Sequence, residues 1–407
     1  MSDTPAGGRL LLLVPTTSYR IGDFLQAAGE LGVEVAVGSN RRQVLEARSE
    51  GRTVTLDLRR PERGCRQIVD YASRHPLQAV VGVDEDTCLL AAMASAALGL
   101  PHNPPAAVAA ALSKEKQRHA LAAAGLPVPE FRRLSCGGDL PQRAREQRYP
   151  AVLKPLSLSA SRGVIRADDA AEFIRAAKRI AAILGRADGA FLVEEFIPGE
   201  EVALEGLLVG GRLEVLALFD KPDPLEGPFF EETIYVTPSR HPAALQARIA
   251  ETAAAACSAL GLTEGPVHAE LRFNPAGVWL IELSPRSIGG LCARSLSFGA
   301  GVPLEDLVLR HALGLPQESL AREDRAAGVM MIPIPKAGRL RAVEGLAAAR
   351  ELSGIVDLVI SVPLGQEVVP LPEGDRYLGF IFAKADDPAM VEEALRQAEA
   401  LLDFHID

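Results

Sequence analysis

Two glutamates in the second half of the chain have the spacing and setting of a metal site. Glu270 lies in the run HAELRF (268–273) and Glu282 in WLIELSPR (279–286), and the turn-forming residues NPAG (274–277) separate them. This pattern predicts two antiparallel strands that bring the carboxylates side by side. Carboxylates that close repel each other unless a cation lies between them, and a hard ion such as Mg²⁺ prefers oxygen ligands. The alternative is an ordinary hairpin with two acids facing solvent.

Two lysines upstream occupy positions suited to phosphate binding. Lys114 lies in a segment (112–131) that predicts a capped helix followed by an extended exit. Lys154 ends a short apolar strand and precedes the small-residue loop SLSASRG (157–163). A lysine there places a charge on a phosphate while backbone N–H groups of the loop approach the same anion. The loop has glycine only at its last position, so a left-handed backbone is costlier in it.

The segment VEEFI (193–197) suits the binding of a purine base. It combines apolar side chains with a backbone predicted to be extended, and an extended chain exposes alternate N–H and C=O groups to a flat ligand.

The order of these features resembles the ATP-grasp enzymes. The resemblance runs from about residue 114 to 314 and is strongest toward the L-amino-acid ligase branch, whose C-terminal lobe is also similar to 328–345 and 370–383. It implies an ATP-grasp fold and an ATP-dependent carboxylate–amine ligase that forms an amide through an acyl phosphate. An amino acid would be at least one substrate. ATP and Mg²⁺ would be the cofactors, with Mn²⁺ as the alternative ion.

The resemblance also implies roles for individual residues at the nucleotide and the metal. The backbones of Glu195 and Ile197 would contact adenine, Glu194 its amino group and Glu201 the ribose hydroxyls. The phosphates would be bound by Lys114, Lys154, Ser159, Ser161 and Gly163. The metal ligands would be Glu270, Glu282 and Ser284. Ser284 stands where the family commonly has asparagine, and its hydroxyl is a weaker magnesium ligand than an amide carbonyl.

Catalysis would rest on Arg286 together with Lys154. The guanidinium fork of Arg286 suits a substrate carboxylate or the acyl phosphate formed from it. Backbone N–H groups of Gly289 and Gly290 would bind the same anion. Arg294 either faces the cleft or pairs with a core acid.

Three further side chains are candidate substrate contacts. His268 shares a strand face with Glu270, so it either touches phosphate or substrate or is an ordinary core histidine. Lys221 begins a long loop (221–240) that predicts a lid, and in this loop Glu232 could receive a substrate ammonium group. The loop after the first strand, PTTSYR (15–20), could face the cleft, but a plain surface turn is the favoured interpretation.

Composition bounds the class of protein. The chain has 407 residues, a net charge of −10 and five cysteines without CxxC spacing. The acidic balance argues against a nucleic-acid partner, and the scattered cysteines indicate reduced thiols. No apolar run is long enough to span a membrane, and 9–14 predicts a first strand and not a signal peptide. We therefore expect a cytoplasmic enzyme of small-molecule carboxylates and amines, with a homodimer left open.

Alternating strands and helices in the N-terminal third predict an α/β fold with a doubly wound parallel sheet. The expected units are an N-terminal α/β domain (1–108), a small ATP-grasp lobe (109–190), a large lobe with the metal and substrate site (191–325) and a small α+β C-terminal lobe (326–407). Two other functions remain open. One is a bicarbonate-using, carboxylase-like enzyme, and the other is a nucleotide-binding module without turnover.

Overall fold

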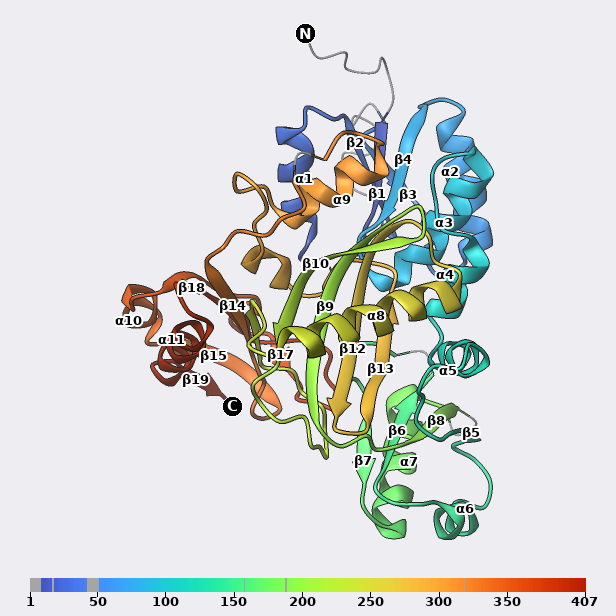
Figure 1. Ribbon diagram of the computed structural model, residues 1–407, viewed down its shortest axis with the longest axis vertical. Helices are drawn as coiled ribbons and strands as arrows, with labels where there is room; N and C mark the ends of the chain where they lie inside the picture. The colour runs from blue at the N-terminus through green and yellow to red at the C-terminus, as the bar shows by residue number, and fades with distance from the viewer. Residues whose placement is uncertain (1–8, 17, 42–50, 157, 187–188, 318) are drawn as a thin grey trace.

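The N-terminal domain is a four-stranded parallel sheet at one end of the molecule (Figure 1). The computed structural model describes residues 9–407 apart from 17, 42–50, 157, 187–188 and 318. The sheet has the order β3-β2-β1-β4. Its elements are β1 (Arg9–Leu13), α1 (Ile21–Glu30), β2 (Val35–Ser39), β3 (Thr53–Thr55), α2 (Pro61–Ala72), β4 (Leu77–Gly82), α3 (Glu85–Leu98) and α4 (Pro105–Ala111).

The apolar run of β1 is buried because helices cover both faces of this sheet. Successive side chains of a strand point to opposite faces. Leu10 and Leu12 join the core that contains α1 and α9 (Leu304–Ala312), whereas Leu11 and Leu13 join the core that contains α2 and α3. The predicted doubly wound parallel sheet is therefore confirmed, and α9 reaches it from far along the chain.

A small antiparallel sheet forms the opposite end of the molecule (Figure 1). Its strand order is β5-β8-β6-β7, and its own apolar core is centred on Phe173 and Phe191. The elements are α5 (Lys114–Ala123), β5 (Phe131–Ser135), α6 (Leu140–Glu146), β6 (Ala151–Pro155), β7 (Ile165–Ala167), α7 (Ala170–Leu184) and β8 (Ala190–Glu195).

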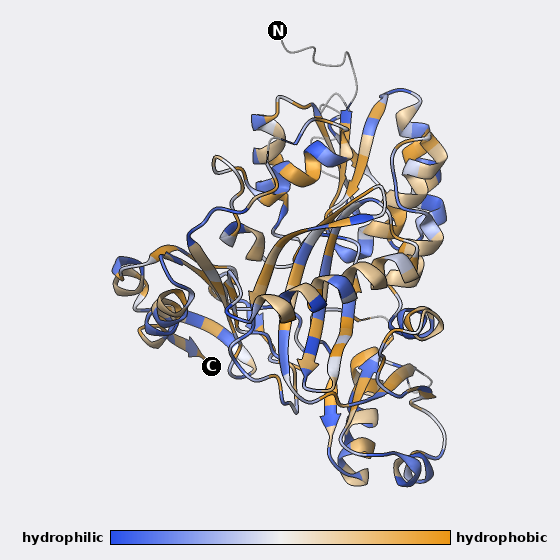
Figure 2. Cartoon of the chain, viewed as in Figure 1, coloured by the Kyte–Doolittle hydropathy of each residue, from blue (hydrophilic) through white to orange (hydrophobic). Residues whose placement is uncertain are grey.

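An eight-stranded sheet of order β13-β12-β9-β10-β11-β14-β18-β16 lies between these ends. Figure 2 shows apolar residues along the strands of this sheet and of the N-terminal sheet. The first part of the large sheet and its helices are β9 (Glu200–Val209), β10 (Arg212–Asp220), β11 (Ile234–Thr237), α8 (Ala243–Leu260), β12 (Gly265–Asn274), β13 (Gly277–Ser284) and the 3₁₀ helix η2 (Cys292–Ser295). The predicted lid, 221–240, thus contains β11, whose β-branched and aromatic residues IYVT are buried within the sheet.

The predicted hairpin of the two glutamates is present. Strand β12 ends at Asn274 and β13 begins at Gly277, and Glu270 lies directly opposite Glu282 in the register of the pair.

The C-terminal residues form both an extension of the large sheet and a second, smaller sheet. Strands β14 (Ala326–Ile332), β16 (Ile355–Ile360) and β18 (Gly379–Ala385) continue the large sheet, so the expected separate lobe shares its backbone hydrogen bonds with β11. The second sheet and the helices comprise β15 (Gly338–Glu344), α10 (Leu346–Glu351), β17 (Glu367–Val368), α11 (Pro388–Ala400) and β19 (Asp403–Ile406).

Two chain-wide features follow the sequence predictions. All five cysteines are free thiols. Among the described residues, every helix is too short or too polar to cross a membrane.

Candidate active site

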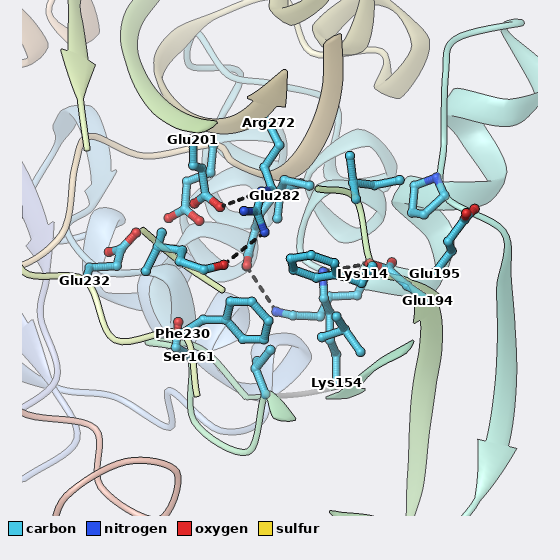
Figure 3. Close-up of a pocket in the computed structure, with 18 of the residues that line it drawn as sticks. Lys114, Lys154, Ser161, Glu194, Glu195, Glu201, Phe230, Glu232, Arg272 and Glu282 are labelled. Carbon is cyan, nitrogen blue, oxygen red and sulfur yellow. Dashed lines mark hydrogen bonds and ion pairs between the residues drawn. The ribbon is translucent and has the colours of Figure 1, made fainter. Parts of the chain in front are cut away.

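A narrow cavity lies between the small sheet and the large sheet, with about 690 Å³ of empty space (Figure 3). Glu201 and Glu232 lie toward one end of the cavity and Glu194 and Glu195 toward the other, with Lys114, Lys154 and Glu282 between them. The apolar lining residues are Val152, Val164, Phe196, Ile197, Leu225, Phe230 and Ile281. A slot lined by both apolar and charged side chains suits a nucleotide.

The linker after β8 forms one wall of this slot. Ile197 lines the cavity, and Phe196 lies against the guanidinium groups of Arg166 and Arg272 at 4.2 and 4.8 Å from the ring centre. The N–H of Glu195 donates to the Glu130 carbonyl (2.9 Å), so this predicted adenine contact has its donor already engaged.

Glu194, the acid predicted to bind the adenine amino group, is paired with two cations. Glu194 is buried and accepts hydrogen bonds from Arg118 at both oxygens (2.6 and 3.1 Å), and Lys154 Nζ lies 2.6 Å from one of them. Burial alone would raise the pKa of Glu194, but Arg118 and Lys154 outweigh it and hold the pKa at about 2. Glu194 also lines the cavity, so its contact with adenine stays a prediction, for a side chain whose oxygens already have cation partners. Its position shows that it orients Lys154 toward the cavity.

Arg118 is the group that the sequence interpretation missed. It follows Lys114 by four residues on α5, so both side chains lie on one face of the helix. That spacing was the available signal. Arg118 also donates to the Ile281 carbonyl (2.7 Å), which ties the small lobe to the large sheet.

The two hairpin acids each have a lysine partner. Lys114 Nζ lies 3.1 Å from Glu282, and Lys221 Nζ lies 3.8 Å from Glu270. Burial would lower the pKa of Lys114, but Glu282 and then Glu85 raise it above its ordinary value. Burial would likewise raise the pKa of Glu282, but the neighbouring cations, Lys114 first, lower it.

Glu270 differs from its partner because acids surround it. Its pKa is raised, first by burial and then by the charges of Glu201 and Glu282, although Lys221 acts in the opposite direction. Carboxylate oxygens of Glu201, Glu232 and Glu270 all lie within 4.8 Å of one another. Such a set of hard oxygen donors in repulsive proximity fits a Mg²⁺ or Mn²⁺ ion.

Lys221 and Glu201 are internal partners in the structure. Lys221 Nζ donates to Glu201 (2.8 Å) and to Glu232, and only 3 % of its side chain is exposed. The second oxygen of Glu201 faces Arg272 Nε at 3.8 Å. Both acids predicted to meet ligand, Glu201 at the ribose and Glu232 at an ammonium group, therefore line the cavity with this lysine as their counter-ion.

The small-residue loop lines the cavities at two of its predicted positions. Ser161 borders the narrow cavity and Ser159 the wider one described below. Ala160 and Ser161 adopt left-handed backbone angles (φ 55° and 53°), the geometry that the sequence marked as costly without glycine. The N–H of Gly163 donates to the Pro372 carbonyl (2.9 Å), so the expected phosphate donor is engaged with the C-terminal part of the chain. Ser157 lies outside the described residues.

A wider cavity, with about 1530 Å³ of empty space, adjoins the first. Both cavities are lined by Ser161, Glu232, Glu270 and Glu282, so they meet at the acids. Gly289 and Gly290 line the wider cavity, as the sequence predicted.

Arg286 enters the wider cavity beside the hairpin acids. Its Nη2 lies 3.3 Å from Glu85, and Nη1 donates to the Ser287 carbonyl (3.0 Å). Burial would lower the pKa of Arg286, but Glu85 and other acids outweigh it and raise the pKa, so the cation persists. The Ser284 hydroxyl donates to the same Glu85 oxygen at 3.3 Å, and Ser284 is not part of the carboxylate cluster.

His268 lies between two acids at the floor of the wider cavity. Its Nδ1 is 3.2 Å from Glu205 and its Nε2 is 3.6 Å from Glu270. The histidine has a buried partner, as in the second interpretation, and since it also lines the cavity its contact with phosphate or substrate stays a prediction.

Two open points around this cavity are decided by the structure. Of the two alternatives for Arg294 the pairing with an acid applies, because its guanidinium donates to both oxygens of Asp23 (2.9 Å each) on α1. The loop 15–20 is not a plain surface turn, since Tyr19 and Arg20 line the cavity, and Arg20 is buried. The loop follows the carboxyl end of a central parallel strand, where ligand sites of such sheets gather.

Three family models match separate parts of this chain. Residues 147–295 match an ATP-grasp domain, 25–102 an ATP-grasp N-terminal domain, and 330–407 the L-amino acid ligase C-terminal domain 2. Residues 147–295 therefore form an ATP-grasp domain. The resemblance seen in the sequence is thus confirmed, including that of the C-terminal residues.

The chain is also similar to individual proteins. It is 27 % identical over 312 residues to the uncharacterized protein y4rH of Sinorhizobium fredii, covering 75 % of this chain and 64 % of that protein. It is 30 % identical over 266 residues to carnosine synthase 1 of Mus musculus, covering 61 % of this chain and 32 % of that protein. The matches thus span less than two thirds of either relative.

The fold of this ATP-grasp chain is also that of a solved relative. The crystal structure of L-amino acid ligase from Bacillus licheniformis superposes with a TM-score of 0.80 at 24 % identity, covering 98 % of this chain and 99 % of that chain.

Proposed function

We propose that this protein is an ATP-dependent carboxylate–amine ligase that forms an amide and releases ADP and phosphate. The observation that carries the proposal is the junction of the two cavities at Glu270 and Glu282. A nucleotide in the narrow cavity would have its phosphates at this junction, and a carboxylate in the wider cavity would approach from the side of Arg286.

The proposed reaction has two steps. A substrate carboxylate oxygen attacks the γ-phosphorus, the bond from that phosphorus to the bridging oxygen breaks, and ADP leaves. An amine then attacks the acyl carbon, the carbon–oxygen bond to phosphate breaks, and the nitrogen loses a proton as the amide forms. The relatives' names support this class, because the chain resembles a carnosine synthase and an L-amino acid ligase.

The chain's own residues would supply position and charge. Lys154, oriented by Glu194, and Lys114 would neutralise phosphate oxygens, and Arg286 would hold the reacting carboxylate. Glu270, together with Glu282 opposite it on the hairpin, would hold Mg²⁺ or Mn²⁺, and Glu201 and Glu232 form a carboxylate cluster with Glu270. When bound, the ion would offset charge on the transferring phosphoryl group. Serines 159 and 161, and the backbones near Glu195 and Ile197, remain proposed nucleotide contacts.

We also keep four predictions about the whole protein as proposals. These are the four units 1–108, 109–190, 191–325 and 326–407, a cytoplasmic location, an amino acid as at least one substrate, and a homodimer.

The test is ADP release by the purified chain with ATP, Mg²⁺ and a panel of acids paired with amines. We expect release to require both an acid and an amine, and to be lost in Lys154→Met and Glu282→Gln. The matched controls are the exposed residues Lys178→Met and Glu200→Gln, which should keep wild-type turnover. Release with bicarbonate alone would favour the carboxylase alternative. Wild-type turnover in both site variants would contradict the proposal.

A further inference from the structure

A segment of the C-terminal part of the chain, residues 370–377, connects β17 to β18 and touches the small lobe on its way. We call it the strap. The N–H of Gly163 donates to the Pro372 carbonyl (2.9 Å), and Arg162 Nε donates to the Glu373 carbonyl (2.8 Å). Arg179 on α7 binds both carboxylate oxygens of Glu373 at 2.5 and 2.8 Å. The strap is therefore fixed to the loop that borders the nucleotide cavity.

The strap has a defined turn at its centre. Gly374 donates its N–H to the Pro370 carbonyl (2.9 Å), and a Cβ placed on Gly374 would lie 1.9 Å from the Val369 carbonyl oxygen. No other residue fits there without a change of backbone. This turn and the contacts to the small lobe hold the next three residues in place.

Those three residues, Asp375, Arg376 and Tyr377, form part of the wall of the wider cavity. Tyr19 from the N-terminal domain lies across Phe380 from Tyr377, with ring centres 5.8 and 6.1 Å from that of Phe380. The wider cavity is thus built from all parts of the chain, and the strap contributes its C-terminal side.

The cations that line the wider cavity are not equally free to bind a ligand. Arg20 donates to the Val83 carbonyl (2.7 Å) and to the hydroxyl of Ser287, and Arg286 faces Glu85. Among the contacts of the described residues, Arg376 has one ion pair, in which its Nε lies 3.9 Å from Oδ1 of the neighbouring Asp375. Its side chain is 48 % exposed. Arg376 is therefore the lining guanidinium with donors to spare.

The other charged groups of this wall favour the binding of an anion at Arg376 over its binding elsewhere in the cavity. The remaining ionisable residues that line the wider cavity are mostly acids: Asp84, Glu85, Asp86, Glu232, Glu270, Glu282 and Asp375. A ligand carboxylate would be repelled elsewhere and attracted to a guanidinium whose fork matches its geometry.

We infer that Arg376 binds the carboxylate of the amine substrate, so that this substrate is an amino acid and not a simple amine. This rests on the proposed ligase function. The reacting carboxylate belongs at Arg286, which lies beside the hairpin acids where the cavities meet. Arg376 belongs to the strap, beside Tyr19, so it is placed to bind a second carboxylate that does not react. Arg376 is a specificity residue and not a catalytic one.

The test compares each proteinogenic L-amino acid with its α-amide as the amine substrate. An α-amide has no free α-carboxylate, so with an amide of a neutral amino acid the only carboxylate comes from the acid partner. In Arg376→Ala we expect the KM for the free amino acid to rise about tenfold or more, since a charge-assisted hydrogen-bonded pair is lost. The KM for the amide, the KM for ATP and kcat should stay within about twofold to threefold of wild type. Arg376→Lys should be intermediate, and Arg341→Ala, an exposed arginine of the same lobe, should change nothing.

A second variant tests the strap itself. Glu373→Gln weakens the pair with Arg179, and it should raise the KM of the free amino acid in the same direction but less, with the amide again unaffected.

Each other outcome is decisive. If Arg376→Ala raised the KM equally for the amino acid and its amide, or raised neither, the assignment of Arg376 would be overturned and the ligase function would stand. A third result would also overturn the inference. If the rise in KM in Arg376→Ala depended on whether the carboxylate substrate carries an acidic side chain, Arg376 would be assigned to that substrate. If the wild-type protein released no ADP with any pair of acid and amine, the ligase function would be overturned, and this inference with it.

Discussion

Replacing Glu194 by glutamine removes the carboxylate that Arg118 and Lys154 share beside the narrow cavity. Arg118 and Glu194 are both 2 % exposed, and the lysine is nearly buried. Glutamine keeps the shape of the side chain but leaves two buried cations without their counter-charge, which is a costly arrangement.

The magnitude follows from the pKa of Glu194. Burial opposes its charge, but Arg118 and Lys154 hold the folded-state pKa at about 2, against an ordinary value of 4.5. This difference of about 2.5, at about 1.36 kcal/mol for each pKa unit, corresponds to about 3 kcal/mol of stability at neutral pH. We expect Glu194→Gln to lower the free energy of unfolding by about that amount, and to raise the KM for ATP because Lys154 loses its partner.

The effect has a specific pH dependence. Because the folded-state pKa lies below the unfolded value, the stabilisation is complete above about pH 5 and is lost as the pH falls from 4.5 toward 2. The difference in the free energy of unfolding between wild type and Glu194→Gln, measured by urea titration, should therefore be constant from pH 8 to pH 6 and smaller by about 1 kcal/mol at about pH 3.5.

The control for this experiment is Glu200→Gln, an exposed acid at the start of β9, which should stay within about 0.5 kcal/mol of wild type. A difference for Glu194→Gln below about 1 kcal/mol at pH 7, or one that does not narrow in acid, would refute the role assigned to this triad.

Two further predictions concern the acids around the metal site. Ser284→Asn should lower the Mg²⁺ concentration for half-maximal ADP release, since an amide carbonyl is a better magnesium ligand than a hydroxyl. A Mg²⁺ titration beside Ser284→Ala checks this, and an unchanged or higher concentration would argue against a metal near Ser284. Lys221→Met should destabilise the protein by about 3–5 kcal/mol, because Glu201, Glu232 and Glu270 lose their shared ammonium group. Added Mg²⁺ should then raise the Tm of this variant more than that of wild type, whereas equal shifts would contradict a cation site at these acids.

Features with a short-range pattern could be predicted from the sequence. The hairpin is one, because two apolar strands around NPAG fix which residues face each other, and Glu270 does lie opposite Glu282. The parallel N-terminal sheet is another, because its strands are continuous apolar runs separated by helices.

Features that depend on distant partners could not be predicted in this way. Glu194 and Arg118 are 76 residues apart, and their pairing exists only because the small lobe folds over α5. The binding of Gly163 to the strap joins segments more than 200 residues apart, and no local pattern encodes it. The choice between the two alternatives for Arg294 stayed open for the same reason, since its partner Asp23 lies on a helix of the first domain.

The central claim is that a substrate carboxylate attacks the γ-phosphorus at the junction beside Arg286. The most direct measurement uses an acid substrate labelled with ¹⁸O in both carboxylate oxygens, together with ATP, Mg²⁺ and an amine. We expect each phosphate released to carry one ¹⁸O from the acid, and we expect the nucleotide product to be ADP. Label in AMP, or phosphate without label while amide forms, would contradict it.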